Sequence, residues 1–449
     1  MSRLFGTDGI RGVANEAPLM PELAYRVGRQ LAVTLCEQRG VERARIVIGR
    51  DTRRSGPLLE SALVSGILSA GSDCLIVGVL PTPGIAFMTR LMEADGGVVL
   101  SASHNPFEDN GIKLFSSEGT KFPDEWEATI ERRLSGPDQA PRARGAQIGR
   151  LIACDHAERD YAAFLRCCFP LDLRGLTIAL DCAHGATYRV APQVFQMLGA
   201  RVHALNGRPD GTNINHGCGA THPEPLAKET VALKADLGLA FDGDGDRLIA
   251  VDETGRICDG DFALAILGRS FARAGQLRGD AVVTTVMANL GLDLSLAEAG
   301  IRVVKTQVGD RYVLEEMQRI GANLGGEQSG HLLLLDHHPA GDGILSGLQL
   351  LAVMRDTGQS LSALASCMTK LPQVLINVAV RAKPPIESLP ELTDRMRDLE
   401  GRMNGAGRIL VRYSGTESRA RVMIEGADRD AIAAMAEELA SIIRRAIGT

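Results

Sequence analysis

A strand–helix–strand pattern occurs three times along this chain of 449 residues and limits the fold more than any other feature. In each copy, a short apolar and β-branched run is followed by a helix with apolar residues at helical spacing, a glycine and a second apolar run. Short strands that alternate with helices are typical of doubly wound α/β layers with parallel strands. We therefore expect three related α/β domains, with helices at 56–70, 187–198 and 289–299 that end at Gly71, Gly199 and Gly300.

From residue 371 onward the pattern changes to strand, helix, strand, strand and helix. Apolar residues along one face of the last helix indicate that it packs on a sheet. This part is therefore expected to be a small α+β domain, with strands at 374–380, 409–411 and 421–424 and helices at 391–403 and 429–446. The expected domains cover residues 1–155, 156–255, 256–370 and 371–449.

Composition excludes several classes of function. The formal net charge of −6 argues against a protein that binds nucleic acid or acidic membranes. No apolar run reaches the roughly 18 residues needed to span a bilayer, and Met1–Gly6 contains no apolar signal core. The nine cysteines are scattered without a Cys-x-x-Cys pair, which indicates reduced thiols rather than disulfides or zinc. We expect a cytoplasmic protein.

Three carboxylates occur within five positions, at Asp242, Asp244 and Asp246, directly after the apolar run Leu237–Phe241. Like charges this close repel one another unless a cation lies among them. The two glycines between them have no Cβ, so the backbone can curl and bring the side chains together. Carboxylate oxygens favour Mg²⁺ or Ca²⁺ over softer metals. The turn therefore predicts a cation site, either a structural calcium loop or a catalytic magnesium site.

Counting along the loop tests the calcium alternative. With Asp242 at position 1, Glu253 falls at position 12, as in a helix–loop–helix calcium site. Position 6 of such a loop is glycine, but here it is Arg247. The flanking segments 237–241 and 248–251 have the pattern of strands, not helices. The count disfavours calcium.

A polar segment, Ser101–Pro106, follows the apolar strand Val98–Leu100. Ligands bind beyond the carboxyl ends of parallel strands, where a hydroxyl such as that of Ser103 could carry a phosphoryl group. Ten residues later, Lys113 could transfer protons if neighbouring cations lower its pKa. The alternatives are an ordinary polar turn and a solvated surface lysine.

Three further loops have groups that suit sugar phosphates, although each by itself could be a common turn. Residues 6–12 combine glycines with Arg11, which could bind an oxyanion. Residues 325–331 offer a carboxylate, an amide, a hydroxyl and an imidazole, which suit sugar hydroxyls. Residues 412–417, with Arg421 beyond them, contain the guanidinium, hydroxyl and glycine groups of a phosphate cradle.

Taken in order, these loops resemble the α-D-phosphohexomutase superfamily over essentially the whole chain. Its serine, triple-aspartate, sugar and phosphate loops correspond to Ser101–Pro106, Asp242–Arg247, Gly326–His331 and Arg412–Glu417. The last loop departs at Tyr413 and Ser418, where the superfamily often has prolines. The resemblance implies three related mixed α/β domains and a C-terminal α+β domain around a central active-site cleft.

Other segments resemble the bacterial branch that acts on glucosamine phosphates, namely Phe5–Gly12, Asn213–Asn215 with Cys218-Gly219, Val308–Arg311, Glu327–Ser329 and Gly341–Gly343. The resemblance implies that glucosamine 6-phosphate and glucosamine 1-phosphate are interconverted through a phosphoserine at Ser103 and a 1,6-bisphosphate. The product would supply UDP-N-acetylglucosamine synthesis. It also implies one Mg²⁺ per chain, held by Asp242, Asp244, Asp246 and the phosphoryl group on Ser103. Glucosamine or glucose 1,6-bisphosphate would be the activator. The sequence leaves the oligomeric state open, with a homodimer among the alternatives.

The same resemblance assigns roles around Ser103. Lys113, Arg11 and Arg247 are expected to transfer protons or stabilise charge, and His104 is expected to orient the loop rather than act as a base. Glu327 and Ser329 would grip the sugar hydroxyls. The phosphate that does not react would be bound by a set of C-terminal residues, Arg412, Ser414, Gly415, Thr416 and Arg421.

Three other functions compete with this expectation. A phosphomannomutase or phosphoglucomutase shares the chemistry but takes another sugar, and Gln328 and Val308–Arg311 favour the amino sugar by resemblance. A non-catalytic sugar-phosphate-binding protein needs no phosphorylatable serine, so Ser103 beside the aspartates argues against it. A calcium-binding protein is the third alternative.

Overall fold

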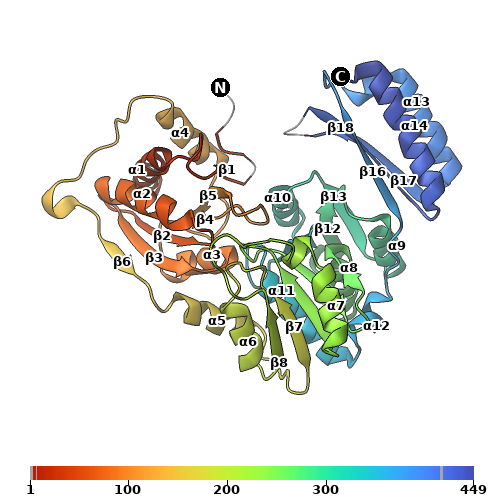
Figure 1. Ribbon diagram of the computed structural model, residues 1–449, viewed down its shortest axis with the longest axis horizontal. Coiled ribbons are helices and arrows are strands. Elements are labelled where there is room, and N and C mark those ends of the chain that lie inside the picture. Colours follow the sequence, from red (N-terminus) through yellow and green to blue (C-terminus); the bar gives the residue numbers. More distant parts are fainter. Residues whose placement is uncertain (1–3, 7, 415–417) are drawn as a thin grey trace. The chain divides into compact units, whose positions relative to one another are not determined.

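The computed structural model describes residues 4–6, 8–414 and 418–449 and divides into two compact units (Figure 1). The first unit holds the chain up to Val286 together with Ile301–Ser366. The second holds Met287–Gly300 and Cys367–Thr449. The expected fold class, three mixed α/β domains and a C-terminal α+β domain, is confirmed by the sheets described below.

The first sheet has the strand order β1-β5-β4-β2-β3-β6. Its centre is parallel, as the repeated pattern predicts, because β2 pairs in parallel with both β3 and β4. On the other side of β4, strands β5 and β1 add antiparallel pairings. The strands are β1 (Ile10–Val13), β2 (Arg45–Arg50), β3 (Asp73–Val79), β4 (Gly96–Leu100), β5 (Asp109–Ser116) and β6 (Leu151–Ala153).

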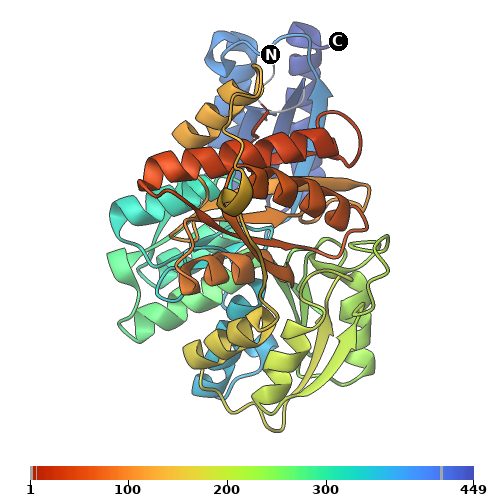
Figure 2. The same cartoon turned by 90° about the vertical axis from the view of Figure 1, so that its left-hand side faces the viewer.

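Helices cover both faces of this sheet. On one face, α1 (Pro21–Arg39) and α2 (Gly56–Ser69) lie side by side (Figure 2) and share a core with α4 (Asp124–Leu134). The two helices approach closely at Gly66, where an added Cβ would lie 2.1 Å from the carbonyl oxygen of Tyr25. On the other face, α3 (Thr82–Leu91) packs on β2 and β4 and contacts α5 (Ala157–Cys168). The sheet is therefore buried on both sides.

The second sheet has the order β11-β10-β9-β7-β8, and its turn between β9 and β10 holds the three aspartates. The pairs β7·β8 and β7·β9 are parallel, and β9·β10 is antiparallel. Strands thus flank the acidic turn on both sides, as predicted. The elements are β7 (Thr177–Asp181), α6 (Val190–Met197), β8 (Arg201–Leu205), α7 (Glu224–Ala232), β9 (Leu237–Phe241), β10 (Leu248–Asp252) and β11 (Ile257–Cys258).

The third sheet has the order β13-β12-β14-β15, and the predicted sugar loop connects β14 to β15. The pair β12·β13 is parallel, as the third copy of the pattern predicts. The elements of this third α/β domain within the first unit are α8 (Gly260–Arg273), β12 (Ala281–Thr285), β13 (Arg302–Thr306), α10 (Asp310–Ile320), β14 (Leu324–Gly326), β15 (Leu332–Leu334), α11 (Gly343–Thr357) and α12 (Leu361–Ala365). Helix α9 (Leu290–Glu298), between β12 and β13 in the chain, belongs to the second unit.

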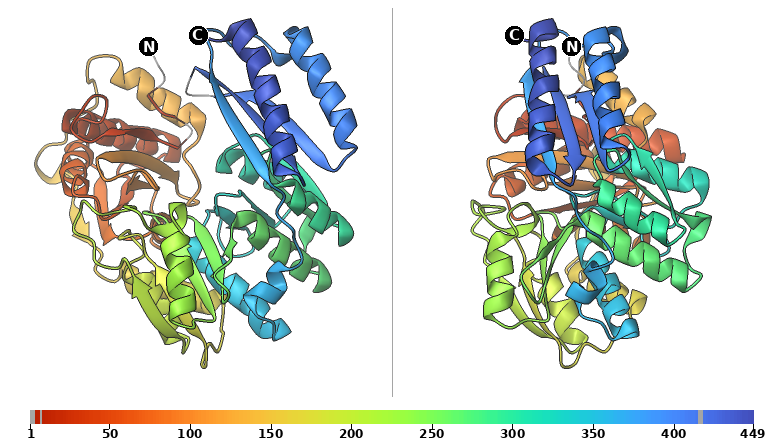
Figure 3. Two further views of the ribbon diagram at one scale, coloured as in Figure 1. Left: turned by 45° about the vertical axis from the view of Figure 1, so that its right-hand side comes forward. Right: turned by 90° about the vertical axis from the view of Figure 1, so that its right-hand side faces the viewer.

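The second unit contains the antiparallel sheet β16-β18-β17, with α13 and α14 side by side on it (Figure 3). Within this unit, the buried carboxylate of Glu425 accepts hydrogen bonds from the side chain of Asn289 at 3.2 Å and the N–H of Leu290 at 3.1 Å. Arg408 pairs with Glu425 at 2.9 Å. The elements are β16 (Gln373–Ala379), α13 (Pro390–Met403), β17 (Gly407–Tyr413), β18 (Arg419–Gly426) and α14 (Arg429–Ile447).

Across the described ranges, none of the helices combines the length and apolar character that crossing a membrane requires.

Candidate active site

Ser103 follows β4 and is buried, with a backbone φ of +52°. This left-handed conformation is unfavourable for a residue with a Cβ and persists only where surrounding contacts hold it. Its N–H donates to Oγ of Ser101 at 2.9 Å. Its own Oγ donates to Oδ2 of Asp242 at 2.7 Å. The loop thus presents one hydroxyl directly to the acidic turn.

A fully buried ion pair between Asp51 and Arg53 contacts the Ser103 loop. The Nε of Arg53 lies 2.8 Å from Oδ2 of Asp51, and Ser101 donates its hydroxyl to the same carboxylate at 2.6 Å. The guanidinium then donates to backbone carbonyls of the loop, those of Ser103 and Asn105 each at 2.9 Å. The guanidinium of Arg53 therefore satisfies carbonyls of a loop that belongs to no sheet or helix, and it holds that backbone in place.

Asp242, Asp244 and Asp246 are all buried, and one ligand atom of each lies within 4.8 Å of the others. Burial and the charges of Asp246 and Asp244 raise the pKa of Asp242 well above its ordinary value. In the part of the chain that the structure describes, Oδ1 of Asp244 and Oδ1 of Asp246 are buried without a hydrogen-bond partner. Buried acceptors of this kind are rare unless another group binds them. The donor set fits a hard divalent cation such as Mg²⁺.

Lys113, on β5, places its ammonium between two of the acidic groups. Its Nζ lies 2.9 Å from Oδ2 of Asp244 and 3.0 Å from Asp8, which in turn pairs with Arg11. Burial lowers the pKa of Lys113, but Asp244 and Asp8 raise it well above its ordinary value. The positive charge of Arg11 would lower this pKa toward the range needed for proton transfer, but the carboxylates outweigh it. In this arrangement Lys113 is a fixed positive charge.

The acidic turn is also held from the first domain by Thr82, at the start of α3. Its hydroxyl donates to Oδ2 of Asp244 at 2.7 Å, and its N–H donates to the carbonyl of Asp244 at 2.8 Å. These contacts fix both the backbone and the side chain of the middle aspartate. They bring the carboxyl ends of the first two sheets together.

His104 lies next to Ser103 in sequence and in space, with Nδ1 3.4 Å from the Ser103 Oγ. Burial, followed by the charges of Arg247 and Arg11, lowers the pKa of His104 to about 4. The imidazole is therefore neutral at neutral pH and is a weak base.

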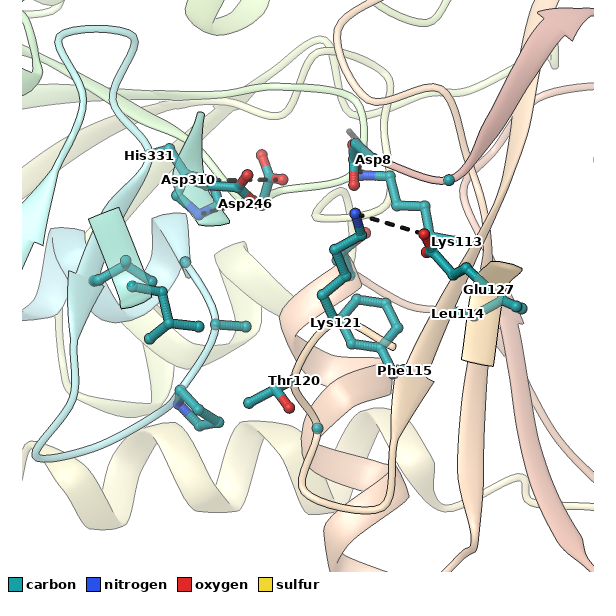
Figure 4. Close-up of a pocket in the computed structure, with 18 residues that line it drawn as sticks. Asp8, Lys113, Leu114, Phe115, Thr120, Lys121, Glu127, Asp246, Asp310 and His331 are labelled. Atoms are coloured by element: carbon teal, nitrogen blue, oxygen red, sulfur yellow. Dashed lines mark ion pairs between the residues drawn. The ribbon is translucent and has the colours of Figure 1, made fainter. Parts of the chain in front are cut away.

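On the other side of the acidic turn, His331 contacts two carboxylates, with Nδ1 3.6 Å from Asp246 and Nε2 3.8 Å from Asp310 (Figure 4). Burial lowers the pKa of His331, but the contact with Asp246 outweighs burial and raises it to about 9. Arg247 lies beside Asp246, at 3.9 Å from its Oδ1. Burial lowers the pKa of Arg247, but Asp242 and Asp246 raise it. Two cations therefore face the triad from this side.

The sugar loop presents Glu327 and Ser329 on the same side, because the hydroxyl of Ser329 lies 3.4 Å from Oε2 of Glu327. The other Glu327 oxygen accepts the N–H of Gly309 at 3.1 Å. Gln328 instead donates its side-chain amide to Asp261 on α8 at 3.0 Å. Its side chain therefore anchors the loop to a helix.

A pocket in the first unit lies beside this cluster and is lined by some of its charged residues (Figure 4). Asp246, Asp310 and His331 line one side, and Asp8 and Lys113 line the other. Within the first unit, contacts link Ser103, Lys113 and Arg247 to the three aspartates, His104 to Ser103, and Arg11 to Lys113 through Asp8. Glu327 and Ser329 lie on the sugar loop that also holds His331, which contacts Asp246.

The predicted phosphate cradle belongs to the second unit. Arg412 on β17 and Arg421 on β18 are directly opposite each other in the hairpin. Burial and the charge of Arg421 lower the pKa of Arg412. Ser414 is buried, and its carbonyl accepts a hydrogen bond from Nζ of Lys383 at 2.6 Å. Two guanidinium groups held on adjacent strands favour an anion. Gly415 and Thr416 lie outside the described residues.

Several supporting residues escape sequence reasoning. Asp51, Arg53 and Thr82 act through contacts with segments 50 or more positions away, and no local pattern marks them. The sequence shows only that Arg50, Asp51 and Arg53 follow the apolar strand 46–49, which does not single out a buried pair. His331 stands within the sugar loop, but only the structure pairs it with Asp246.

Models of the phosphoglucomutase/phosphomannomutase family match the chain in domain order, and together they cover most of it. The alpha/beta/alpha domains I, II and III match residues 2–140, 160–255 and 259–371, and the C-terminal domain matches residues 375–442. The chain belongs to this family of phosphohexomutase enzymes.

Curated relatives narrow the likeness. The phosphoglucosamine mutase of Anaeromyxobacter sp. (strain Fw109-5) is 53% identical over 453 aligned residues, covering 99% of this chain and 96% of the relative. Among solved structures, a phosphoglucomutase/phosphomannomutase family protein from Burkholderia thailandensis is 25% identical with a TM-score of 0.82, covering 100% of this chain and 99% of that one. The N-acetylphosphoglucosamine mutase of Aspergillus fumigatus, solved with GlcNAc-6P and magnesium, shares the fold at 20% identity and a TM-score of 0.72, with coverage of 99% and 96%. The resemblance found in the motifs is thus confirmed.

The Asp51–Arg53 pair yields a stability prediction. Replacing Arg53 with Met leaves Asp51 buried without its partner, which should cost about 3–5 kcal/mol of unfolding free energy. Arg54→Met, at the exposed neighbouring position, is the matched control. Burial already raises the pKa of Asp51, and loss of Arg53 raises it further. A group with a raised folded-state pKa loses stability as pH rises, so the deficit should be larger at pH 8 than at pH 5. Thermal unfolding measures both effects, and equal midpoints for the two variants would contradict the assignment.

Proposed function

We propose that the chain is a phosphoglucosamine mutase, which interconverts glucosamine 6-phosphate and glucosamine 1-phosphate. The observation that carries the chemistry is the hydroxyl of Ser103, 2.7 Å from Asp242 in a buried carboxylate triad. The amino sugar is supported by whole-length relatives of that name at 51–54% identity. The product would supply UDP-N-acetylglucosamine synthesis.

In the first half of the reaction, phosphorylated Ser103 donates its phosphoryl group to the C1 hydroxyl of glucosamine 6-phosphate. The bond between phosphorus and the Ser103 Oγ breaks, and a bond from phosphorus to the C1 oxygen forms. The C1 hydroxyl loses its proton, and the Ser103 oxygen gains one. The result is glucosamine 1,6-bisphosphate and a free serine.

In the second half, the bisphosphate turns around and returns its 6-phosphoryl group to Ser103. The released product is glucosamine 1-phosphate, and the phosphoenzyme is restored. An enzyme that loses the bisphosphate before it turns is left without its phosphoryl group. Glucosamine or glucose 1,6-bisphosphate would then act as an activator, because either can phosphorylate Ser103 again.

A single Mg²⁺ would be held by Asp242, Asp244, Asp246 and the phosphoryl oxygen on Ser103. The unpartnered buried oxygens of Asp244 and Asp246 support this assignment, as does the magnesium in the Aspergillus fumigatus structure. The ion would neutralise negative charge on the phosphoryl group during transfer.

The chain's own cations act around the same group. Lys113 offsets the charge of Asp244 and Asp8. Arg11 and Arg247, at the edges of the cluster, would stabilise charge on the oxygens of the moving phosphoryl group. His104, neutral because its pKa is lowered to about 4, would orient the Ser103 loop rather than remove the substrate proton.

The sugar and its distal phosphate need separate groups. Glu327 and Ser329 share one side of their loop, which supports a role in holding sugar hydroxyls. The opposed guanidinium groups of Arg412 and Arg421 support a role in binding the phosphate that does not react, together with Ser414, Gly415 and Thr416. We also infer that the enzyme works in the cytoplasm, since scattered cysteines without a Cys-x-x-Cys pair are typical of a reducing compartment. A homodimer is part of the proposal, and light scattering tests it.

The phosphoserine mechanism predicts that Ser103→Ala lowers kcat by roughly 10³-fold or more, because no other group can carry the phosphoryl. Thermal unfolding should remain close to that of the native protein. Intact mass should show one added phosphoryl group on the native protein after incubation with glucose 1,6-bisphosphate and none on the variant. Turnover by the variant at the native rate would disprove the mechanism.

The metal assignment predicts that Asp244→Asn weakens Mg²⁺ binding by at least about tenfold, since a hard charged ligand is replaced by a neutral amide. Calorimetric titration of the phosphorylated enzyme with Mg²⁺ measures this effect without depending on turnover. Asp210→Asn, in an exposed turn, is the control and should bind as the native protein does. Activation by Ca²⁺ in place of Mg²⁺ would instead revive the calcium alternative.

The choice of sugar is tested by comparing kcat/KM for glucosamine, glucose and mannose 6-phosphates or 1-phosphates under identical activation. We expect glucosamine phosphate to be preferred by about 10²-fold or more, the scale that separates near-isosteric substrates, because glucose and mannose have a hydroxyl in place of the amine. If mannose or glucose phosphate gives the higher value, the protein is a phosphomannomutase or a phosphoglucomutase.

A further inference from the structure

A side chain from the second α/β domain contacts the Ser103 loop. Asn215 lies on the segment that follows β8, 112 positions beyond Ser103, and it is buried. Its Nδ2 donates to the carbonyl of Ser103 at 2.8 Å and to the carbonyl of Asn105 at 3.0 Å. Because both partners are acceptors, the amide must present its NH₂ group to them.

The same two carbonyls also accept hydrogen bonds from Arg53, both at 2.9 Å. Each carbonyl therefore has one donor from the first domain and one from the second. The space around them is full: a Cβ added at Gly243, in the acidic turn, would lie 2.6 Å from the Ser103 carbonyl oxygen and 2.8 Å from Nδ2 of Asn215. The amide thus lies where the Ser103 loop meets the acidic turn.

Asn215 has a left-handed backbone conformation, which asparagine tolerates better than most residues. Its φ is +59°, and its N–H donates to the carbonyl of Ala183 at 2.9 Å. Its Oδ1 is buried and has no hydrogen-bond partner in the described chain. A buried amide used only for stability normally has both of its ends satisfied. The hydrogen bonds to the two loop carbonyls are therefore the side-chain contacts through which Asn215 can act on the loop.

We propose that Asn215 is a positioning residue for phosphoryl transfer at Ser103. By holding the Ser103 and Asn105 carbonyls from the domain that carries the acidic turn, it sets the distance between the Ser103 Oγ and the carboxylate triad. A displacement of about 1 Å at a reacting group is enough to cost roughly 10²-fold in rate. The proposal rests on the proposed function, because it assigns Asn215 a role in transfer from phosphorylated Ser103.

Asn215→Asp is the sharpest test, because it keeps the shape of the side chain and removes the NH₂ donor that faces the two carbonyls. Asn213→Asp is the matched control in the same loop. The Asn213 side chain donates to the carbonyl of Arg208 and accepts from the N–H of Asp210, both at 3.0 Å and both within its own loop. Both variants gain one negative charge and lose one amide.

The measurement is single-turnover transfer of labelled phosphoryl from Ser103 to glucosamine 6-phosphate by quenched flow, with kcat, KM and thermal unfolding recorded in parallel. We expect Asn215→Asp to slow transfer and kcat by about 10- to 100-fold, with KM changed by less than about threefold because no sugar contact is lost. Asn213→Asp should transfer at the native rate. Asn215→Ala, which adds no charge, provides the same comparison if the aspartate variant does not fold.

Two results overturn the inference. One is transfer by Asn215→Asp or Asn215→Ala at the rate of the Asn213 control. The other is a loss of activity that matches the fraction of unfolded protein, with native transfer by the folded remainder, since that is what a merely structural role produces. If the native enzyme itself transfers no phosphoryl from Ser103, the proposed function fails instead, and the two failures are distinct.

Discussion

The repulsion among three buried carboxylates is the constraint on which the rest of the first unit depends. Asp242, Asp244 and Asp246 are buried, and one carboxylate oxygen of each lies within 4.8 Å of the others. Their charge must therefore be balanced locally. The structure supplies Lys113 and His331 as fixed cations from two different domains. A divalent ion among the carboxylates would add to that balance. Charge balance therefore explains why segments far apart in the chain converge on one turn.

The Ser103 loop is subject to a different constraint, because it places irregular backbone beside charged groups and its carbonyls need hydrogen-bond donors from elsewhere. Its carbonyls lack sheet or helix partners, and Ser103 has a positive φ. Arg53 supplies most of the missing donors, and the buried Asp51 keeps that guanidinium in place. Donors from a single rigid side chain reduce the freedom of the loop more than separate contacts would, because they move together.

Much of the fold could be predicted from the sequence because its information is local. The apolar runs 46–49 and 74–77 place β2 and β3 within one or two residues, and the glycine at 71 does the same for the end of α2. The strands that flank the acidic turn are equally clear. Helix α6 begins three residues later than expected, at Val190 instead of 187, because its first turn is taken up by the loop after β7. Whether neighbouring strands pair in antiparallel orientation, and so whether the sheets are mixed, has no such local pattern; the mixed sheets are implied by the family resemblance.

In the candidate site too, some residues can be recognised from the local sequence, and the roles of others depend on contacts with distant segments. Three aspartates in one turn predict a cation because the repulsion is visible in the sequence itself. Lys113 is the opposite case: its pKa depends on Asp244 and Asp8, both distant in the chain, and the structure raises it where proton transfer would need it lowered. Gln328 is expected to mark the amino sugar, yet its amide is bound to Asp261 on α8. Its effect on the choice of sugar would then act through the shape of the loop.

Helix α9 has a consequence for how the last part of the chain can be separated from the rest. The helix is encoded between β12 and β13, but its start is fastened to the C-terminal sheet through Glu425. The backbone therefore passes between the two units at three places, near residues 286, 300 and 366. Ending the chain at residue 370 would remove Glu425 and Leu371, two of the residues that hold Asn289 at the start of α9. The C-terminal unit is thus interlaced with its neighbour in sequence, and the two cannot be exchanged between relatives by a single cut.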